Sequence, residues 1–158
     1  MTEIIPLQTA SQSDLLALNN AFAAETSYQS EDDWARLIEQ ARFGYAVPPA
    51  DGFLIGMDEA ADYHSPNFLW FKARFDRFAY VDRIVISASA HGRGLGRALY
   101  ERMFDDAKAA GFERIVAEVN TTPPNPISLA FHERLGFVAI AERTFNDRKS
   151  VRYFERRL

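Results

Sequence analysis

The fold is decided by a run that reads Tyr80-Val81-Asp82-Arg83-Ile84-Val85-Ile86 and by the turn after it, His91-Gly92-Arg93-Gly94-Leu95-Gly96-Arg97. The β-branched residues of the first run predict a strand over 80–86. The closely spaced glycines let the backbone curl so that several N–H groups face one place. A helix predicted over 94–110 adds its own unpaired N–H groups and the positive end of its dipole. Such a turn favours a phosphate-bearing ligand, and Arg93 and Arg97 add positive charge.

A second informative segment reads Asn125-Pro126-Ile127-Ser128-Leu129-Ala130-Phe131-His132-Glu133-Arg134-Leu135-Gly136-Phe137. Asparagine is a good N-cap, and proline suits the first helical position that follows it. Glycine is the usual residue just past a helix end. The segment therefore predicts a helix that begins at Asn125 and stops at Gly136.

The remaining residues predict a mixed order of helices and strands. Helices are expected from Ser11 or Ser13 to about Ala24 and over 31–41, and strands over 3–6, 43–47, 52–57, 114–119, 137–144 and 150–156. Residues 58–79 are the least regular, and we expect a short helix or an ordered loop there. Since the chain has 158 residues and shows no linker or repeat, we expect one domain over 1–158.

Composition excludes several functional classes. The chain has no cysteine, which rules out disulfides, thiolate metal sites and a cysteine nucleophile. Its three histidines lack metal-type spacing, so we expect no metal. No basic run supports nucleic-acid binding, no apolar segment is long enough to span a membrane, and the first residues do not resemble a signal peptide. A cytoplasmic protein is therefore expected.

Charge is unevenly distributed along the chain. Residues 1–79 hold five Lys/Arg and twelve Asp/Glu, whereas residues 80–158 hold thirteen and ten. This asymmetry suits an anionic ligand in the second half and a cationic one in the first. The alternative is ordinary solvated surface charge.

The glycine-rich turn alone is a weak signal. It lacks the G-x-x-x-x-G-K-[ST] pattern of nucleotide hydrolases, and its glycines follow G-x-G-x-G rather than the dinucleotide pattern G-x-G-x-x-G. However, the turn resembles the [QR]-x-x-G-x-[GA] pyrophosphate loop of the GNAT-type acetyltransferase superfamily. The segment from Asn125 to Phe137 resembles that superfamily's second signature, N-x-x-A-x-x-[LF]-Y-E-x-x-G-F. The resemblance covers about residues 80–140.

This resemblance implies an α/β (α+β) fold with a mixed central sheet of six to seven strands, about four flanking helices and two splayed central strands. It implies an acetyl-CoA-dependent N-acetyltransferase that moves an acetyl group to a primary amine by direct attack. Acetyl-CoA would contact Ile86, His91, Gly92, Arg93, Gly94, Leu95, Gly96, Arg97, Asn125 and Ser128. In this arrangement a backbone N–H near Ile86 would stabilise the oxyanion of the tetrahedral intermediate. His91 stands where the family usually has Gln or Arg.

Three residues are candidates for proton transfer. His132 occupies the position of the family's common tyrosine, which is credited with protonating the departing thiolate; the alternative is a packed side chain. Asp82 or Glu118 would take the proton from the amine, and we favour Asp82 because simple alternation places it on the face of Ile86. The alternatives are ion pairs, of Asp82 with a nearby arginine or of Glu118 with Arg114, and deprotonation by water.

The acceptor pocket in this family is built by the first helix pair and the neighbouring loops. The candidates here are Asn20, Ser27, Tyr28 and Tyr80, together with Asn19, Glu25, Phe68 and Trp70; capping or core packing is the alternative for each. We expect a small-molecule or peptide amine as acceptor, and a homodimer is possible because dimers are frequent in the family. A non-catalytic acyl-CoA sensor or partner-binding domain on the same fold remains the alternative function.

Overall fold

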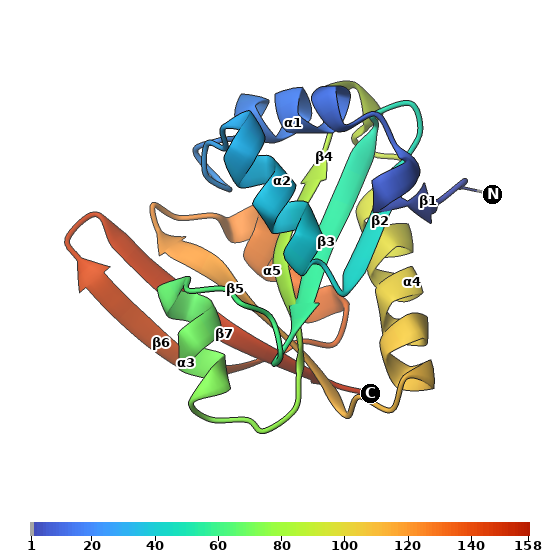
Figure 1. The fold of residues 1–158 in the computed structure, drawn as a ribbon. Coiled ribbons are helices and arrows are strands. Elements are labelled where there is room, and N and C mark those ends of the chain that lie inside the picture. The colour runs from blue at the N-terminus through green and yellow to red at the C-terminus, as the bar shows by residue number, and fades with distance from the viewer. Residues whose placement is uncertain (1) are drawn as a thin grey trace.

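A seven-stranded mixed sheet forms the centre of the molecule in the computed structural model, which describes residues 2–158 (Figure 1). The strands lie in the order β1-β2-β3-β4-β5-β7-β6. Their bounds are β1 Ile5–Pro6, β2 Phe43–Val47, β3 Gly52–Asp58, β4 Ala79–Ile86, β5 Arg114–Thr122, β6 Val138–Asn146 and β7 Lys149–Arg157. The five α-helices of these residues are α1 Gln12–Ala21, α2 Glu31–Gln40, α3 Pro66–Lys72, α4 Leu95–Ala109 and α5 Pro126–Arg134.

The helices cover both faces of the sheet. One apolar cluster contains Leu15 of α1, Trp34 of α2 and Phe68 of α3, packed on the strands. The other contains Leu99 and Met103 of α4, with the segment that follows α5. Burial of these side chains holds the layers together and leaves the strand ends to carry polar groups.

The two central strands separate soon after they meet. β4 and β5 run parallel and pair only through Ala79 with Ile115 and Tyr80 with Val116. Beyond Tyr80, β4 stays paired with β3 while β5 pairs with β7. The expected splay of two central strands is therefore confirmed.

A bulge in β4 lies at the start of the separation. Ile55 of β3 faces Arg83 and Gly56 faces Val81, so Asp82 has no partner opposite it. The extra residue interrupts the alternation of side chains between the two faces. Accordingly, Val81 and Ile84 both contact the cluster on the α4 side, although they are three residues apart.

Several predicted bounds need correction. β1 comprises only Ile5–Pro6, α1 ends at Ala21 rather than near Ala24, and β5 continues to Thr122. Residues 58–79 contain the helix α3, whose first position is Pro66. That makes five helices in the described part of the chain, against about four expected.

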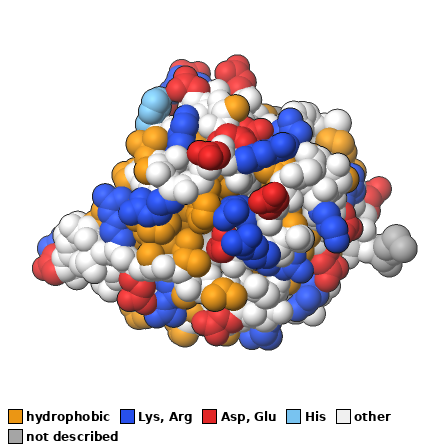
Figure 2. Space-filling view, turned by 90° about the horizontal axis from the view of Figure 1, so that it is seen from below, with side chains coloured by type: hydrophobic (Ala, Val, Ile, Leu, Met, Phe, Trp, Pro, Cys, Tyr) orange, Lys and Arg blue, Asp and Glu red, His pale blue; other side chains and the backbone are white. Residues whose placement is uncertain are grey.

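Hydrophobic and positively charged side chains lie next to one another on the face shown in Figure 2. Arginines stack on aromatic rings at several places: Arg74 lies 3.8 Å from the ring centre of Trp70, and Arg114 lies 4.3 Å from that of Phe75. Such contacts account for surface arginines without a ligand. Within residues 2–158, no helix combines the length and the apolar character that crossing a membrane requires.

Candidate active site

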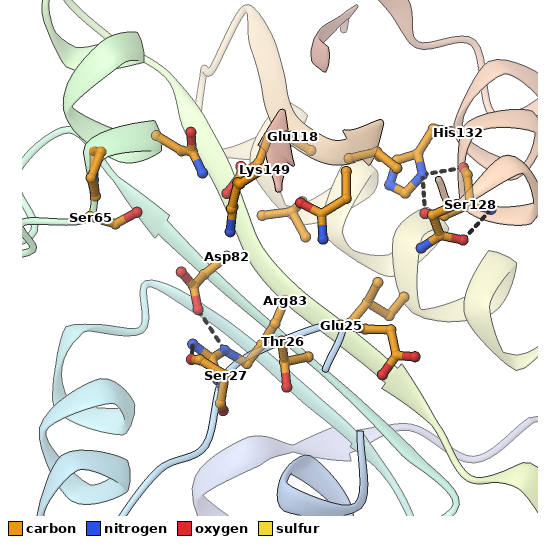
Figure 3. A pocket seen from close by; sticks show the side chains of 18 of the residues that line it. Glu25, Thr26, Ser27, Ser65, Asp82, Arg83, Glu118, Ser128, His132 and Lys149 are labelled. Atoms are coloured by element: carbon orange, nitrogen blue, oxygen red, sulfur yellow. Dashed lines mark hydrogen bonds and ion pairs between the residues drawn. The ribbon is translucent and has the colours of Figure 1, made fainter. Parts of the chain in front are cut away.

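A cavity of about 590 Å³ lies where β4 and β5 separate (Figure 3). Residues of β4 and β5 line it, together with residues of the loop after α1, the start of α3, α4, α5 and the β6–β7 hairpin. The lining residues used below are Ser27, Tyr63, Asn67, Asp82, Arg83, Ile84, Tyr100, Glu118, Asn125, Ser128, His132 and Lys149.

The turn before α4 presents a row of backbone donors. Gly92 and Gly94 have φ angles of +80° and +72°, a conformation that favours glycine, and Gly94 is the N-cap of α4. Among residues 2–158, no acceptor bonds the N–H groups of residues 92–97; the first helical bond runs from the Ala98 N–H to the Gly94 carbonyl. These donors and the helix dipole together form a site for an anion.

Two further residues of this turn anchor it to the fold. The side chain of Leu95 is buried in the core at 2% exposure. At Gly96 a Cβ would lie 3.1 Å from the ring of Phe131, which is closer than ordinary van der Waals contact, so a side chain here would press on α5. The turn is thus packed against the core and against α5.

The charged side chains of the turn are engaged by the protein itself. Arg93 pairs with Asp51 at 2.9 Å, and Arg97 lies 3.5 Å from Glu101. His91 Nε2 lies 3.0 Å from the carbonyl oxygen of Ile86, so the imidazole closes the link from β4 to the turn. Both arginines stay more than half exposed, so donors of their guanidinium groups remain available beside those of the backbone.

Beyond Tyr80, one edge of β4 has no strand beside it, because β5 has separated from it. Backbone N–H and carbonyl groups of every second residue point toward this open edge. The Ser87 N–H donates to the Asp51 carbonyl at 2.8 Å, which makes these two residues a hydrogen-bonded pair across β3 and β4. Because such pairs alternate along an antiparallel ladder, the N–H groups of Ile84 and Ile86 point away from β3. They are directed toward the gap.

Glu118 lines the cavity and has one carboxylate oxygen without a hydrogen-bond partner in the described chain. Its Oε1 accepts a hydrogen bond of 2.7 Å from the Tyr80 hydroxyl, whereas its Oε2 is buried without a partner among residues 2–158. Burial raises the pKa of this carboxyl to about 7, against the lowering effect of the Tyr80 bond; the negative charge of Asp82 adds to the rise. A carboxyl with this pKa can accept a proton near neutral pH. The alternative pairing with Arg114 is wrong, because Arg114 contacts Glu155 of β7 at 2.8 Å.

Both carboxylate oxygens of Asp82 are buried and have partners. Its Oδ2 lies 2.7 Å from Arg83 Nε, and its Oδ1 accepts a bond of 2.5 Å from the Tyr63 hydroxyl. Tyr63 packs on the cluster of α1 to α3, whereas Ile86 packs on the opposite cluster. The expectation that Asp82 shares the face of Ile86 is thus wrong, because the bulge breaks the alternation. The structure shows the ion pair that was the alternative for Asp82.

His132 is buried at 4% exposure, and both of its ring nitrogens have partners. Nδ1 lies 2.8 Å from the Ser128 carbonyl oxygen, which can only accept, so Nδ1 carries the proton. Nε2 then accepts the bond of 2.6 Å from the Tyr100 hydroxyl of α4. Burial lowers the pKa of His132 and favours the neutral ring. At the start of the same helix, Asn125 accepts from the Ser128 N–H and caps α5.

Side-chain hydrogen bonds hold the loop after α1 to the end of that helix. The Asn20 side chain bonds the backbone N–H and carbonyl of Gln29, each at 3.0 Å, and does not line the cavity. Ser27 does line it, and its backbone carbonyl accepts a bond of 2.9 Å from the Asn19 side chain. Glu25 also lines the cavity from this loop.

Four expected acceptor-site residues lie elsewhere. Tyr28 is 71% exposed and outside the cavity. Tyr80 is fully buried and reaches the site only through its bond to Glu118. Phe68 is in the core, and Trp70 stacks on Tyr153, so core packing is the correct reading for both rings.

Sequence reasoning missed several residues of the cavity wall. Tyr63 and Asn67 come from the irregular stretch 58–79, and Lys149 comes from the β6–β7 hairpin. Tyr100 lies at a helix position that periodicity assigns to the core. Only its polar hydroxyl on a buried face offered a signal, since such a group needs a partner.

The residues present fit a coenzyme A-type ligand. The unpaired N–H groups before α4 suit a pyrophosphate, and the backbone edge of β4 beside the gap suits an extended amide-containing chain. Across residues 2–158, no group of three His, Cys, Asp or Glu side chains could hold a metal ion.

Comparisons with known proteins agree with this architecture. An L-methionine sulfoximine/L-methionine sulfone acetyltransferase of Salmonella typhimurium is 30% identical over 111 residues, and the L-amino acid N-acyltransferase MnaT of Escherichia coli is 28% identical over the same length. Each alignment covers 69% of this chain and 58% of the relative, so the match extends over little more than half of either relative.

Among solved structures, the ribosomal-protein-S18-alanine N-acetyltransferase of Escherichia coli is similar with a TM-score of 0.70 and 20% identity, covering 99% of this chain and 94% of that one. The NatC complex bound to Gag peptide and CoA contains a chain similar with a TM-score of 0.75 and 15% identity, covering 99% and 98%. At these identities the likeness shows the fold alone. Residues 13–137 match the family model of the acetyltransferase (GNAT) family, and the chain belongs to that family.

Proposed function

We propose that this protein is an acetyl-CoA-dependent N-acetyltransferase that transfers the acetyl group directly to a primary amine. The observation that carries the proposal is Glu118, a carboxylate with an unpaired oxygen that lines the cavity between the splayed strands. A buried carboxylate oxygen without a hydrogen-bond partner is costly for the fold, so its presence in a cavity points to a role in the chemistry.

The chain's backbone would hold the donor. Acetyl-CoA would supply an acyl group already activated as a thioester. The N–H groups of residues 92–97 would hold its pyrophosphate, and Asn125 and Ser128 lie on the cavity wall at the start of α5. The N–H groups of Ile84 and Ile86 would face the thioester arm and place hydrogen-bond donors beside its carbonyl.

Glu118 would accept the proton of the attacking amine. We prefer it to Asp82, because Asp82 already bonds Arg83 and Tyr63 while Glu118 Oε2 is free of partners in the described chain. Its pKa of about 7 leaves a large fraction ionised at neutral pH, yet keeps it basic enough to take a proton.

Tyr100 and His132 would act together on the departing sulfur. His132 Nδ1–H is held by the Ser128 carbonyl, so the one mobile proton of the pair is that of the Tyr100 hydroxyl. We therefore assign the role expected of His132 to Tyr100: its hydroxyl would turn its proton from His132 Nε2 to the departing thiolate, and solvent would return a proton to the phenolate.

The relatives differ in the acceptors that their names give. Two are named for L-methionine sulfoximine or L-amino acids, and one solved structure is named for an alanine of a ribosomal protein. Small-molecule and protein amines are therefore both open for this chain.

The test combines binding with turnover. Calorimetric titration with acetyl-CoA should show saturable binding, and a thiol-detection assay with a panel of primary amines should show free coenzyme A released only when an amine is present. Glu118→Gln should bind acetyl-CoA like the wild type and release thiol at least ~100-fold more slowly. Binding without thiol release from any amine would favour the non-catalytic acyl-CoA sensor, and absence of binding would contradict both.

A further inference from the structure

Two basic side chains line the cavity, Arg83 and Lys149, and the protein itself provides hydrogen-bond partners for the first of them. The Arg83 guanidinium is 8% exposed. It contacts Asp82 at 2.7 Å through Nε, Asn19 Oδ1 at 3.0 Å and Ser27 Oγ at 3.4 Å. Because each side of the guanidinium already faces an acceptor, Arg83 has no free side for a ligand.

The second cation, Lys149, has no such partners. It is the first residue of β7, and its amine points into the cavity in Figure 3. Within residues 2–158 it lies within 4.0 Å of no carboxylate, whereas Arg152 on the same strand pairs with Glu142 at 2.7 Å. Lys149 is exposed, so it places a positive charge without a carboxylate partner at the solvent-facing rim of a cavity that also holds Glu118.

We propose that Lys149 binds a carboxylate of the acceptor, so that the preferred substrates are amino acids rather than neutral amines or protein N-termini. This inference rests on the proposed N-acetyltransferase function. A zwitterion matches the two groups left without partners: its amine would face Glu118, and its carboxylate would face Lys149. A peptide N-terminus has an amide in place of that carboxylate and would leave the lysine unpaired.

The test compares L-alanine, L-leucine, L-methionine and L-glutamine with their α-amides. An amide has a less basic amine than its acid, so the informative quantity is the acid-to-amide ratio of kcat/KM in each variant. Lys149→Met keeps an unbranched side chain that is one atom shorter and removes the charge. Lys108→Met, on the last turn of α4 and outside the cavity, is the matched control.

Lys149→Met should lower the acid-to-amide ratio at least ~10-fold, mainly through KM for the acid, and should leave KM for acetyl-CoA unchanged. Lys149→Arg should restore part of the ratio, and Lys108→Met should match the wild type. An equal loss for acids and amides would overturn the proposal, as would a rise in KM for acetyl-CoA, which would place Lys149 on the donor's phosphates.

A calorimetric titration of each amino acid in the presence of coenzyme A separates the two hypotheses. If a Lys149-dependent acid binds but is never acetylated, the proposed function fails and the carboxylate site stands. If amines are acetylated with no preference between acid and amide, the function stands and the carboxylate site fails.

Discussion

The two ends of the strand gap are built differently. At the proposed donor end, a continuous run of residues 92–97 offers backbone N–H groups, and the two arginines nearby each make one ion pair with the protein. At the proposed acceptor end, side chains from several separate parts of the chain meet, and hydrogen bonds hold Asp82 and Glu118 in place. A backbone site depends on glycine and on helix position, whereas a side-chain site depends on each residue type.

This difference indicates which residues can be substituted without changing the site. Replacing His91 or Arg97 alters no backbone donor, so the departure of His91 from the family pattern is compatible with the donor site. Replacing Glu118 or Lys149 changes the chemistry of the cavity directly. The following predictions test this contrast.

The largest effect is expected at the donor end from Gly94→Glu. Gly94 has a φ of +72°, and a glutamate there would be strained and would bring negative charge to the anion site. We expect acetyl-CoA affinity, measured by calorimetry, to fall at least ~100-fold. Gly111→Glu is the control, because Gly111 has a φ of +85° at the other end of α4. Both variants should lose similar stability in thermal unfolding; equal losses of acetyl-CoA affinity would contradict a specific donor site at Gly94.

At the acceptor end, Glu118→Gln should change the pH dependence of turnover. The wild-type rate should rise through an inflection near pH 7, because the carboxylate is the active form and the pKa is about 7. The variant should lose this inflection and ~100-fold of kcat, with acetyl-CoA affinity retained. Glu113→Gln, an exposed acid just before β5, should keep the wild-type profile. An unchanged inflection in Glu118→Gln would remove Glu118 as the base.

A smaller effect is expected where the two ends meet, at Tyr100 and His132. Tyr100→Phe and His132→Phe should each lower kcat about 10-fold with little change in acetyl-CoA affinity. The double variant should be hardly slower than either single one, because the two groups act through one hydrogen bond. Steady-state kinetics on the three variants decides this, and unaltered turnover in all of them would assign the proton to water.

The last expected effect concerns stability rather than activity. The folded-state pKa of Glu118 is raised to about 7, so the folded protein binds this proton more tightly than the unfolded chain. This contribution is present at low pH and is lost as pH rises from about 4.5 to 7. Glu118→Gln should therefore gain about 3 kcal/mol over the wild type at pH 8 and nothing at pH 4. Thermal unfolding at the two pH values measures the gain, and an equal gain at both would attribute it to packing instead.

Much of the fold could be predicted from the sequence because its signals are local. Alternating β-branched residues placed β4, glycines placed the turn before α4, and the Asn125-Pro126 pair placed the start of α5. The irregular stretch 58–79 could not be resolved, since its helix α3 is short and is held by contacts of Phe68 and Phe71 with the sheet.

The partners of the charged side chains could not be predicted in the same way. Arg114 lies four residues from Glu118 on one strand, but β7 is the neighbour of β5 and brings Glu155 to Arg114 instead. A one-residue bulge turned Asp82 away from the face that alternation assigns to it. Both outcomes depend on strand order and register, which single-strand patterns do not contain.

The sequence by itself determined the family resemblance, the donor-binding turn and the identity of the candidate acids, because each is a property of contiguous residues. Only the tertiary structure decided which acid is left with an unpaired oxygen, that Tyr100 hydrogen-bonds to His132, and that Lys149 lines the cavity without a carboxylate partner. The reason is physical: a backbone conformation is determined over a few residues, whereas the partners of a side chain are determined by which distant segments the sheet brings beside it.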